Sequence, residues 1–251
     1  MASTLLWKPL PVATLTVRQF LGGRAVRVVT LLAFLPCVFG LIYLLNTDVA
    51  TAREFLTETI FIEMVAPTLL PITVLILATG ALGNEIEDRT LPYLALKPLS
   101  RLRIVVEKLL GVLAVAVPIV LAGLAATFLV VMRGDARDET EILAAMLAAA
   151  AVGTLAYSAV FMLVSLIIPR ALLVGIIYTF VWESLLGRFL PGLRVVSVRH
   201  AVKSIFVGML DHLEISMDNA TAPMTATIVV VAVAVVCVVL ATWRLQRMNL
   251  D

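Results

Sequence analysis

The sequence predicts an all-α integral membrane protein with six transmembrane helices. Three observations support this fold class: 62% of the 251 residues are hydrophobic, only 14% are charged, and the apolar residues gather in long runs between charged turns. Soluble domains are about half apolar and about a quarter charged, so this chain has too few polar residues to cover a water-exposed surface. We expect residues 1–251 to form a single transmembrane domain.

Six apolar runs are long enough to cross a membrane. A helix needs roughly 20 mainly apolar residues to span a hydrocarbon core about 30 Å thick, because each residue adds about 1.5 Å. The runs that meet this length are residues 28–45, 61–83, 104–132, 142–168, 171–190 and 223–243. Prolines within spans are tolerated where neighbouring groups satisfy the freed carbonyls. The prolines in these runs therefore predict kinks rather than helix ends: Pro36, Pro67, Pro71 and Pro118.

The lysines and arginines predict the orientation, since cytoplasmic loops carry an excess of them. We place both termini, residues 84–108 and the Pro169–Arg170 turn on one side of the membrane. That side then holds 12 of the 19 basic residues, and the other side holds 12 of the 17 acidic residues. Both termini are therefore expected in the cytoplasm. Four basic residues between positions 188 and 203 oppose this assignment, and a cytoplasmic location for them would change the number of spans.

Residues 1–27 are expected to form an N-terminal interfacial segment. Within it, residues 12–27 (VATLTVRQFLGGRAVR) place an apolar side next to arginines that face the headgroups. The residues of that apolar side are Val12, Leu15, Phe20 and Leu21. Such an amphipathic helix lies in the membrane plane and is attracted to anionic lipid, and Gly22–Gly23 predicts a bend before the first span. The alternative is a loose basic leader that only sets topology. Signal cleavage after residues 50–52 is not expected, because the preceding basic region is long and amphipathic.

Residues 191–222 form an unusually long connection between the fifth and sixth spans. Hydrophobic residues recur in it at helical spacing and are expected on one side of a helix. They are Val195, Val198, Val202, Ile205, Phe206 and Met209. We expect one or two short helices lying on, or dipping into, the outer leaflet; a structured loop is the alternative.

Several site chemistries are excluded. The chain has no Gly-Lys dipeptide, so it lacks the phosphate-binding P-loop of nucleotide hydrolases. His200 and His212 lack the spacing of a zinc protease and have no nearby cysteine, and no nucleophile elbow is present. A net charge of +2 does not indicate a nucleic-acid partner. We therefore expect no catalytic site, no metal site and no cofactor bound by this chain.

Two carboxylates fall in or near the expected spans, where an ionisable group is a functional candidate by default. Glu183 lies in the outer part of the fifth span, and Glu63 lies near the outer start of the second. In one interpretation they line a substrate path or a lateral opening. In the other they anchor helices at the outer interface, with Glu183 near Arg188. The sequence leaves both interpretations open.

The charged segment 84–103 joins the second and third spans on the inner side. It is about twenty residues long, whereas a simple connection needs only a handful. Glu85 and Glu87 favour a helix N-terminus, and Ser100 is expected to cap the helix that continues into the third span. We expect a short helix held below the membrane between two rigid corners. A partner that binds such an element can push on both attached spans.

The same residues carry a family resemblance. The runs Asp88-Arg89-Thr90-Leu91 and Lys97-Pro98-Leu99-Ser100-Arg101, followed by Lys108, resemble the cytoplasmic loop of type-2 ATP-binding-cassette (ABC-2) permeases. The close match covers about thirty residues, and the six-span layout extends it over the chain. In that family the loop holds a coupling helix that sits in a cleft of the ATPase subunit. The resemblance assigns coupling to Glu85, Glu87, Arg89, Thr90, Leu91, Pro98, Ser100 and Arg101. Arg89 stands where many members have glycine.

The resemblance also implies the partners. It predicts an exporter permease in a prokaryotic cell membrane, paired with a second permease copy as a homodimer or close heterodimer. Two copies of an ATPase subunit would bind the ATP and Mg²⁺. The apolar spans favour an amphipathic, lipid-like or peptide cargo. Two alternatives are a non-transporting membrane scaffold or assembly factor that recruits a cytoplasmic protein, and an ion-coupled carrier. The carrier ranks last, because no span has a charge at its centre.

Overall fold

The computed structural model describes residues 10–45, 51–87, 99–134, 136–137, 139–168, 170–182, 197–210 and 220–247, without the side chains of residues 84–87, 180 and 182. All regular structure in these residues is helical, which confirms the all-α class. The helices are α1 (Pro11–Leu21), α2 (Arg24–Tyr43), α3 (Ala52–Glu54), η1 (Phe55–Leu69), α4 (Leu70–Glu87), α6 (Arg101–Met132), α7 (Thr140–Ile167), α8 (Ala171–Ile177), η2 (Tyr178–Trp182), α10 (Val198–Met209) and α11 (Pro223–Arg247). The two η elements are π-helices.

Five helices in the described residues are long and apolar enough to cross a membrane. They cover residues 24–43, 52–83, 101–132, 140–167 and 223–247. The remaining expected span, residues 171–190, begins as α8 and η2 and is described only to residue 182, so the sixth span stays a prediction. All four prolines lie inside continuous helical runs, as expected for kinks.

The second span begins nine residues earlier than predicted. Thr51 caps it, because its hydroxyl accepts a hydrogen bond from the Glu54 main-chain nitrogen at 3.2 Å. The helix then runs through α3, η1 and α4 without a break. Glu58 and Glu63 are tolerated in this stretch because both side chains are exposed. The prediction started the span after Glu58 because it counted only apolar residues, whereas the helix also includes the residues before it.

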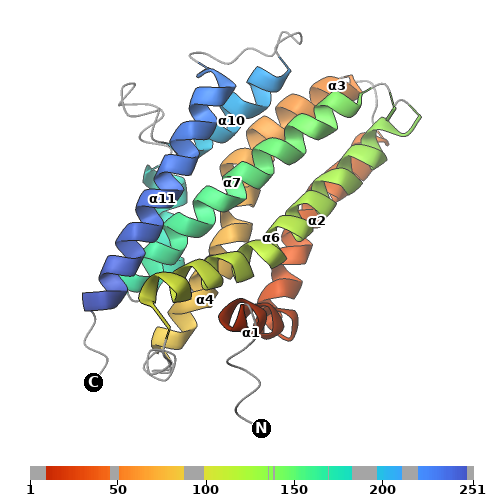
Figure 1. Ribbon diagram of the computed structural model, residues 1–251. Helices are drawn as coiled ribbons and strands as arrows, with labels where there is room; N and C mark the ends of the chain where they lie inside the picture. Colours follow the sequence, from red (N-terminus) through yellow and green to blue (C-terminus); the bar gives the residue numbers. More distant parts are fainter. Residues whose placement is uncertain are drawn as a thin grey trace.

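The long helices form a bundle with two distinct ends (Figure 1). Helix α1 lies across the end at which α11 finishes, and α3 and α10 lie at the opposite end. We name these the inner end and the outer end, following the predicted orientation. That α1 and the finish of α11 share one end agrees with the prediction that both termini face the same side.

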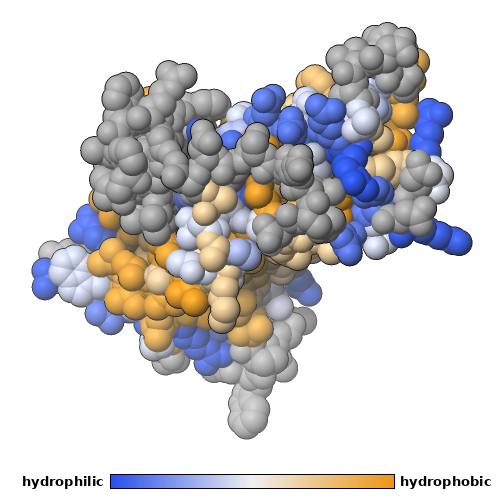
Figure 2. All heavy atoms as spheres, turned by 90° about the horizontal axis from the view of Figure 1, so that it is seen from above, coloured by the Kyte–Doolittle hydropathy of each residue, from blue (hydrophilic) through white to orange (hydrophobic). Residues whose placement is uncertain are grey.

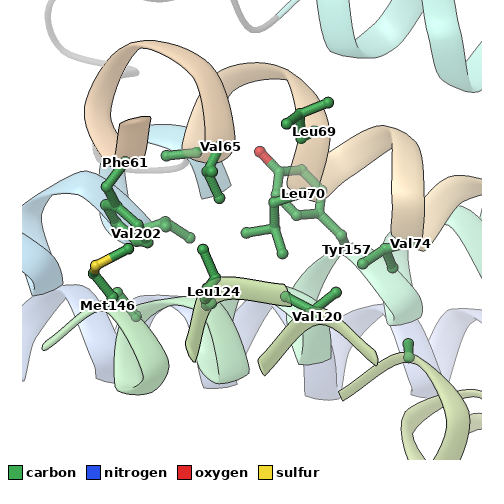
Figure 3. Packing of buried hydrophobic residues seen from close by; sticks show 14 of the residues in the cluster. Phe61, Val65, Leu69, Leu70, Val74, Val120, Leu124, Met146, Tyr157 and Val202 are labelled. Atoms are coloured by element: carbon green, nitrogen blue, oxygen red, sulfur yellow. The ribbon is translucent and has the colours of Figure 1, made fainter. Parts of the chain in front are cut away.

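The core is formed where η1, α4, α6, α7 and α10 meet. Phe61 of η1, Leu70 of α4 and Val202 of α10 point into it together with Leu124 and Tyr157 (Figure 3). The Phe61 and Phe206 rings lie 4.2 Å apart between centroids, which fixes α10 against η1. This packing confirms the predicted helix in segment 191–222, since Val198, Val202, Ile205 and Phe206 are all buried.

Glycines let the helices approach closely at two crossings. A Cβ on Gly123 of α6 would lie 2.1 Å from the carbonyl oxygen of Ala33 in α2, so the two backbones are in direct contact. A Cβ on Gly153 of α7 would lie 2.6 Å from the Val202 side chain. This second contact places α10 beside the middle of α7 rather than above its end.

The outward faces of α2 and α11 are apolar, and these two helices are the least buried of the five candidate spans. Seen from the outer end in Figure 2, hydrophobic residues cover one flank of the molecule and hydrophilic residues gather elsewhere on this face. A flank of this composition suits contact with lipid chains.

The predicted surface helices differ from expectation in detail. Helix α1 ends at Leu21 before Gly22–Gly23, as predicted, and Val12 and Phe20 are buried. Leu15 and Leu21 are 38% and 66% exposed, so they do not share the inward-packed face of α1 with Val12 and Phe20. That inward face also includes Ala13 and Thr16. In α10, Met209 is exposed, and Val195 lies outside the described residues.

Candidate functional site

The candidate site lies at the inner end, where α6 begins after the 84–98 segment. Ser100 has an extended backbone and its hydroxyl accepts a hydrogen bond from the Arg103 main-chain nitrogen at 3.3 Å. It is therefore the N-cap of α6, as the sequence predicted. Helix α6 then continues from Arg101 without interruption into the third span.

The other predicted coupling residues are only partly placed. Glu85 and Glu87 lie in the last turn of α4 rather than at a helix N-terminus, so that part of the prediction was wrong; the helix of the second span continues past Gly83–Asn84. The side chains of Glu85 and Glu87 are outside the described residues. Arg89, Thr90, Leu91 and Pro98 also lie outside them. Arg101 is the first residue of α6, and its Nη1 is buried with no hydrogen-bond partner among the residues that the structure describes. The expected short helix between α4 and α6 thus stays a prediction.

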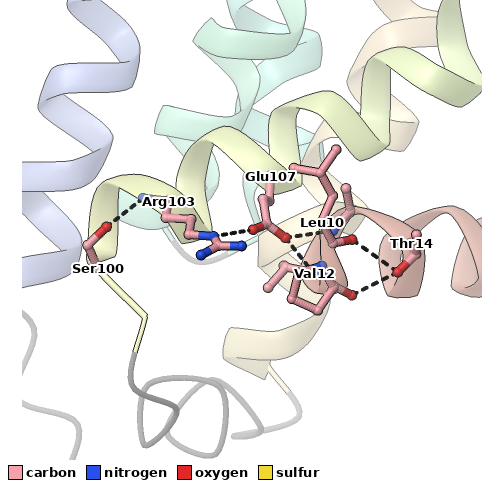
Figure 4. Close-up of polar contacts among 8 residues, drawn as sticks. Leu10, Val12, Thr14, Ser100, Arg103 and Glu107 are labelled. Carbon is pink, nitrogen blue, oxygen red and sulfur yellow. Dashed lines mark hydrogen bonds and ion pairs between the residues drawn. The ribbon is translucent and has the colours of Figure 1, made fainter. Parts of the chain in front are cut away.

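Glu107 is a buried residue of this site that the sequence did not single out. It lies two turns into α6, is 1% exposed, and receives hydrogen bonds from three donors (Figure 4). Arg103 Nε donates to Oε1 at 2.7 Å. The main-chain nitrogens of Val12 and Ala13 donate to Oε2 at 2.7 and 3.3 Å.

These contacts make Glu107 an external cap for α1. The first N–H groups of a helix have no partner within the helix, and the helix dipole attracts negative charge there. Pro11 opens α1 and brings no N–H, so the next two nitrogens reach the carboxylate. The only signal in the sequence is an acidic residue just inside an apolar run, and nothing in that signal identifies a partner 95 residues away.

Helix α1 is also packed tightly along α6. A Cβ on Gly111 would lie 2.8 Å from the Thr16 Cβ and 3.2 Å from the Ala13 carbonyl oxygen. Thr16 is fully buried at this contact, and its hydroxyl donates to the Val12 carbonyl at 3.0 Å. The sequence prediction of a helix resting on lipid is therefore incomplete, because α1 is fixed to the third span as well.

A second apolar cluster holds the start of α6 against three other helices. Ile104 and Val105 pack with Leu82 of α4, Met162 of α7 and Leu245 of α11. The fully buried Lys108 lies in the same turns of α6 and is engaged in a polar interaction. Movement of the α6 start is thereby linked to α1 and to the inner ends of α4, α7 and α11.

At the outer end, Glu63 is exposed on η1 and lies close enough to α10 to act on Lys203. The pKa of Lys203 lies below its ordinary value because burial disfavours the ammonium ion. The positive charge of Arg199 lowers this pKa further, whereas Glu63 opposes the shift. Glu63 thus lies near the charged side chains of α10, and its role as an anchor or as part of a substrate path stays a prediction. Glu183 lies outside the described residues.

The described residues hold no group of histidine, cysteine, aspartate and glutamate side chains suited to a metal ion. What this part of the chain presents at its inner end is a capped helix start, the Arg103–Glu107 ion pair and a docked surface helix.

Comparison with known families agrees with the helical layout. Residues 23–187, about two thirds of the chain, match the model described as ABC-2 family transporter protein. The chain belongs to the ABC-2 transporter family. Membrane subunits of this family are transport permeases that have no ATPase site of their own and work with an ATPase partner. No curated protein matches the chain closely enough to count as a relative.

The matched region spans α2 to the segment that follows η2, and so includes the α4–α6 connection. Helix α1, α10 and α11 lie outside it. The resemblance noted from the loop residues is therefore confirmed at the level of the family, whereas the roles of the individual loop residues stay predictions.

Proposed function

We propose that this chain is the membrane-spanning permease subunit of an ABC exporter, driven through residues 84–103 by a separate ATPase subunit. The observation that carries the proposal is the connection between this segment and the bundle. The segment enters α6 at the Ser100 cap, and α6 is joined to α1 through Glu107. A displacement of the segment would therefore be passed directly through α6 to the third span.

The proposed cycle has two permease copies and two ATPase subunits in a prokaryotic cell membrane. ATP and Mg²⁺ bind to the ATPase subunits, and closure of those subunits moves the segment 84–103. The third span and α1 then tilt together, and cargo passes outward between the permeases or laterally into the outer leaflet. The chain itself binds no cofactor in this scheme.

The experiment is to purify the permease with its ATPase and measure the ATPase rate in lipid nanodiscs. Arg101→Glu and Pro98→Gly are expected to abolish permease-dependent stimulation while leaving membrane insertion intact. Arg137→Glu is a matched control, because it reverses an exposed arginine in the α6–α7 connection at the outer end. Equal stimulation in all three variants would contradict coupling through this segment. Isolation of the permease with no nucleotide-hydrolysing subunit would favour the scaffold function instead.

A further inference from the structure

Arg199 of α10 reaches across the outer end to two other segments. Its Nη2 donates to the carbonyl oxygen of Pro67 at 3.1 Å and to the carbonyl oxygen of Thr179 at 2.7 Å. Pro67 belongs to η1 in the second span, and Thr179 belongs to η2, 132 and 20 residues away along the chain. One guanidinium group therefore joins the backbones of two different segments.

Pro71 removes one donor that the Pro67 carbonyl could use within its own helix. In the α-helical register that begins with α4, this carbonyl would accept from residue 71, but Pro71 has no N–H. Carbonyls freed by prolines in membrane helices must be satisfied by neighbouring groups. Arg199 supplies a donor to this carbonyl, and the two carbonyls in turn stabilise the positive charge of the partly buried guanidinium group.

The position of Arg199 is set by rigid packing of α10. Ser197 caps α10 by accepting from the His200 main-chain nitrogen at 3.2 Å. Val202 fits against Gly153 of α7, and the Phe206 ring packs against the Phe61 ring at a tilt. The guanidinium group is thus presented to η1 and η2 by a helix that is itself anchored to α7.

From this geometry we propose that Arg199 is a positioning residue that ties the outer half of the second span to η2, so that the two segments move as one unit. Both segments are π-helical, and π-helical turns often mark functional sites in helices. The tie is a property of the permease alone. Its role during transport rests on the proposed function, but its existence does not.

The test uses the full-length permease in nanodiscs without ATPase. Spin labels are placed on Thr59 of η1 and Val181 of η2, both exposed, in a background with Cys37→Ala and Cys237→Ala. A narrow distance distribution is expected for native Arg199. Arg199→Met is expected to broaden the distance distribution, whereas Arg199→Lys, which keeps the charge and the donors, should restore much of the narrow distribution.

Lys203→Met is the matched control on the next turn of α10 and should leave the distance distribution narrow. An unchanged distribution in Arg199→Met, or equal broadening in Lys203→Met, would overturn the proposal.

A second variant keeps the test decisive if Arg199→Met folds poorly. Pro71→Ala restores an N–H that can satisfy the Pro67 carbonyl from within the helix. In the Pro71→Ala background, Arg199→Met should lower the apparent unfolding temperature by about half, or less, of the decrease that the same substitution causes in the native background, as expected for coupled sites. The distance distribution should nevertheless stay broad, because the link to Thr179 is still missing. A narrow distribution in the Pro71→Ala/Arg199→Met variant would refute the tie. None of these results depends on ATP, so they are independent of any failure of ATPase coupling.

Discussion

The carboxylate of Glu107 lies 2.7 Å from the main-chain nitrogen of Val12, a residue 95 positions earlier in the chain. Through this contact, the helix that precedes the first span is bound to the helix that opens the third. The same carboxylate pairs with Arg103, which follows the Ser100 cap by three residues. The inner end of α6 is thus a junction of the N-terminal helix and the segment proposed to bind the ATPase.

Replacing Glu107 should loosen α1. We expect Glu107→Ala to destabilise the protein by about 2–3 kcal/mol, because it leaves buried donors of α1 and Arg103 without their charged acceptor. Thr16 is buried in the native protein. A cysteine introduced by Thr16→Cys should therefore react with a water-soluble maleimide from the inner side only once Glu107 is replaced. Glu139→Ala is the control: it breaks the more exposed Arg53–Glu139 ion pair, which is worth about 1 kcal/mol or less. Equal labelling in the two variants would contradict the capping role.

The α2–α6 crossing should not accept a side chain at Gly123. A methyl group there meets the Ala33 carbonyl oxygen, so Gly123→Ala must push the helices apart, at a cost of roughly 1–3 kcal/mol. Gly83→Ala is a matched change, since its Cβ would lie an ordinary 3.7 Å from Ser165, and alanine favours the helix by about 1 kcal/mol. Thermal unfolding in detergent should rank Gly83→Ala at or above the native protein and Gly123→Ala below it. The opposite order would refute the close crossing.

The start of α6 should depend on the Ser100 hydroxyl. Ser100→Ala removes the acceptor for the Arg103 N–H and should cost about 1 kcal/mol, whereas Ser100→Asp retains a cap. Hydrogen exchange of the Arg103 amide reports the difference directly. Exchange should accelerate in Ser100→Ala and stay near the native rate in Ser100→Asp. Equal rates in all three proteins would show that the cap contributes nothing.

Lys203 should make stability depend on pH. Its pKa in the folded protein is lowered by burial and by Arg199, so between that pKa and the ordinary value of 10.5 the unfolded chain binds more protons than the folded one. The free energy of unfolding should therefore increase as the pH rises through this window and decrease again as the pH falls back through it. Lys203→Met should lack this rise relative to the native protein when apparent unfolding temperatures are compared from neutral to alkaline pH. A parallel pH dependence in both proteins would contradict the lowered pKa of the partly buried Lys203.

Local features of the sequence predicted a large share of this fold. Apolar runs located five spans to within a few residues at most ends, because burial in lipid demands length and apolarity together. Ser100 after Pro98 predicted the start of α6, and Gly22–Gly23 predicted the break between α1 and α2. In each case the cause lies within a few residues of the effect.

Features that depend on distant contacts were not predictable. The sequence around Glu107 does not reveal that the residue caps a helix 95 positions away. The π-helical character of η1 is likewise hidden, since the same apolar composition suits an α-helix. Leu15 and Leu21 were grouped with Val12 and Phe20 because apolar pattern alone cannot decide which side of α1 meets α6. These outcomes are set by packing between elements rather than by the local sequence.

The unbroken helix from Ala52 to Gly83 has a consequence for what the cell exterior meets. Its 32 residues would extend roughly 48 Å at the α-helical rise, and somewhat less over the π-helical Phe55–Leu69, which is still well beyond a hydrocarbon layer about 30 Å thick. In the predicted orientation, with the Gly83 end at the inner boundary, the first turns would stand clear of the bilayer on the outer side, where Arg53, Glu54 and Glu58 are exposed. In that orientation, water-soluble molecules that approach the protein from outside would meet these charged side chains above the level of the lipid.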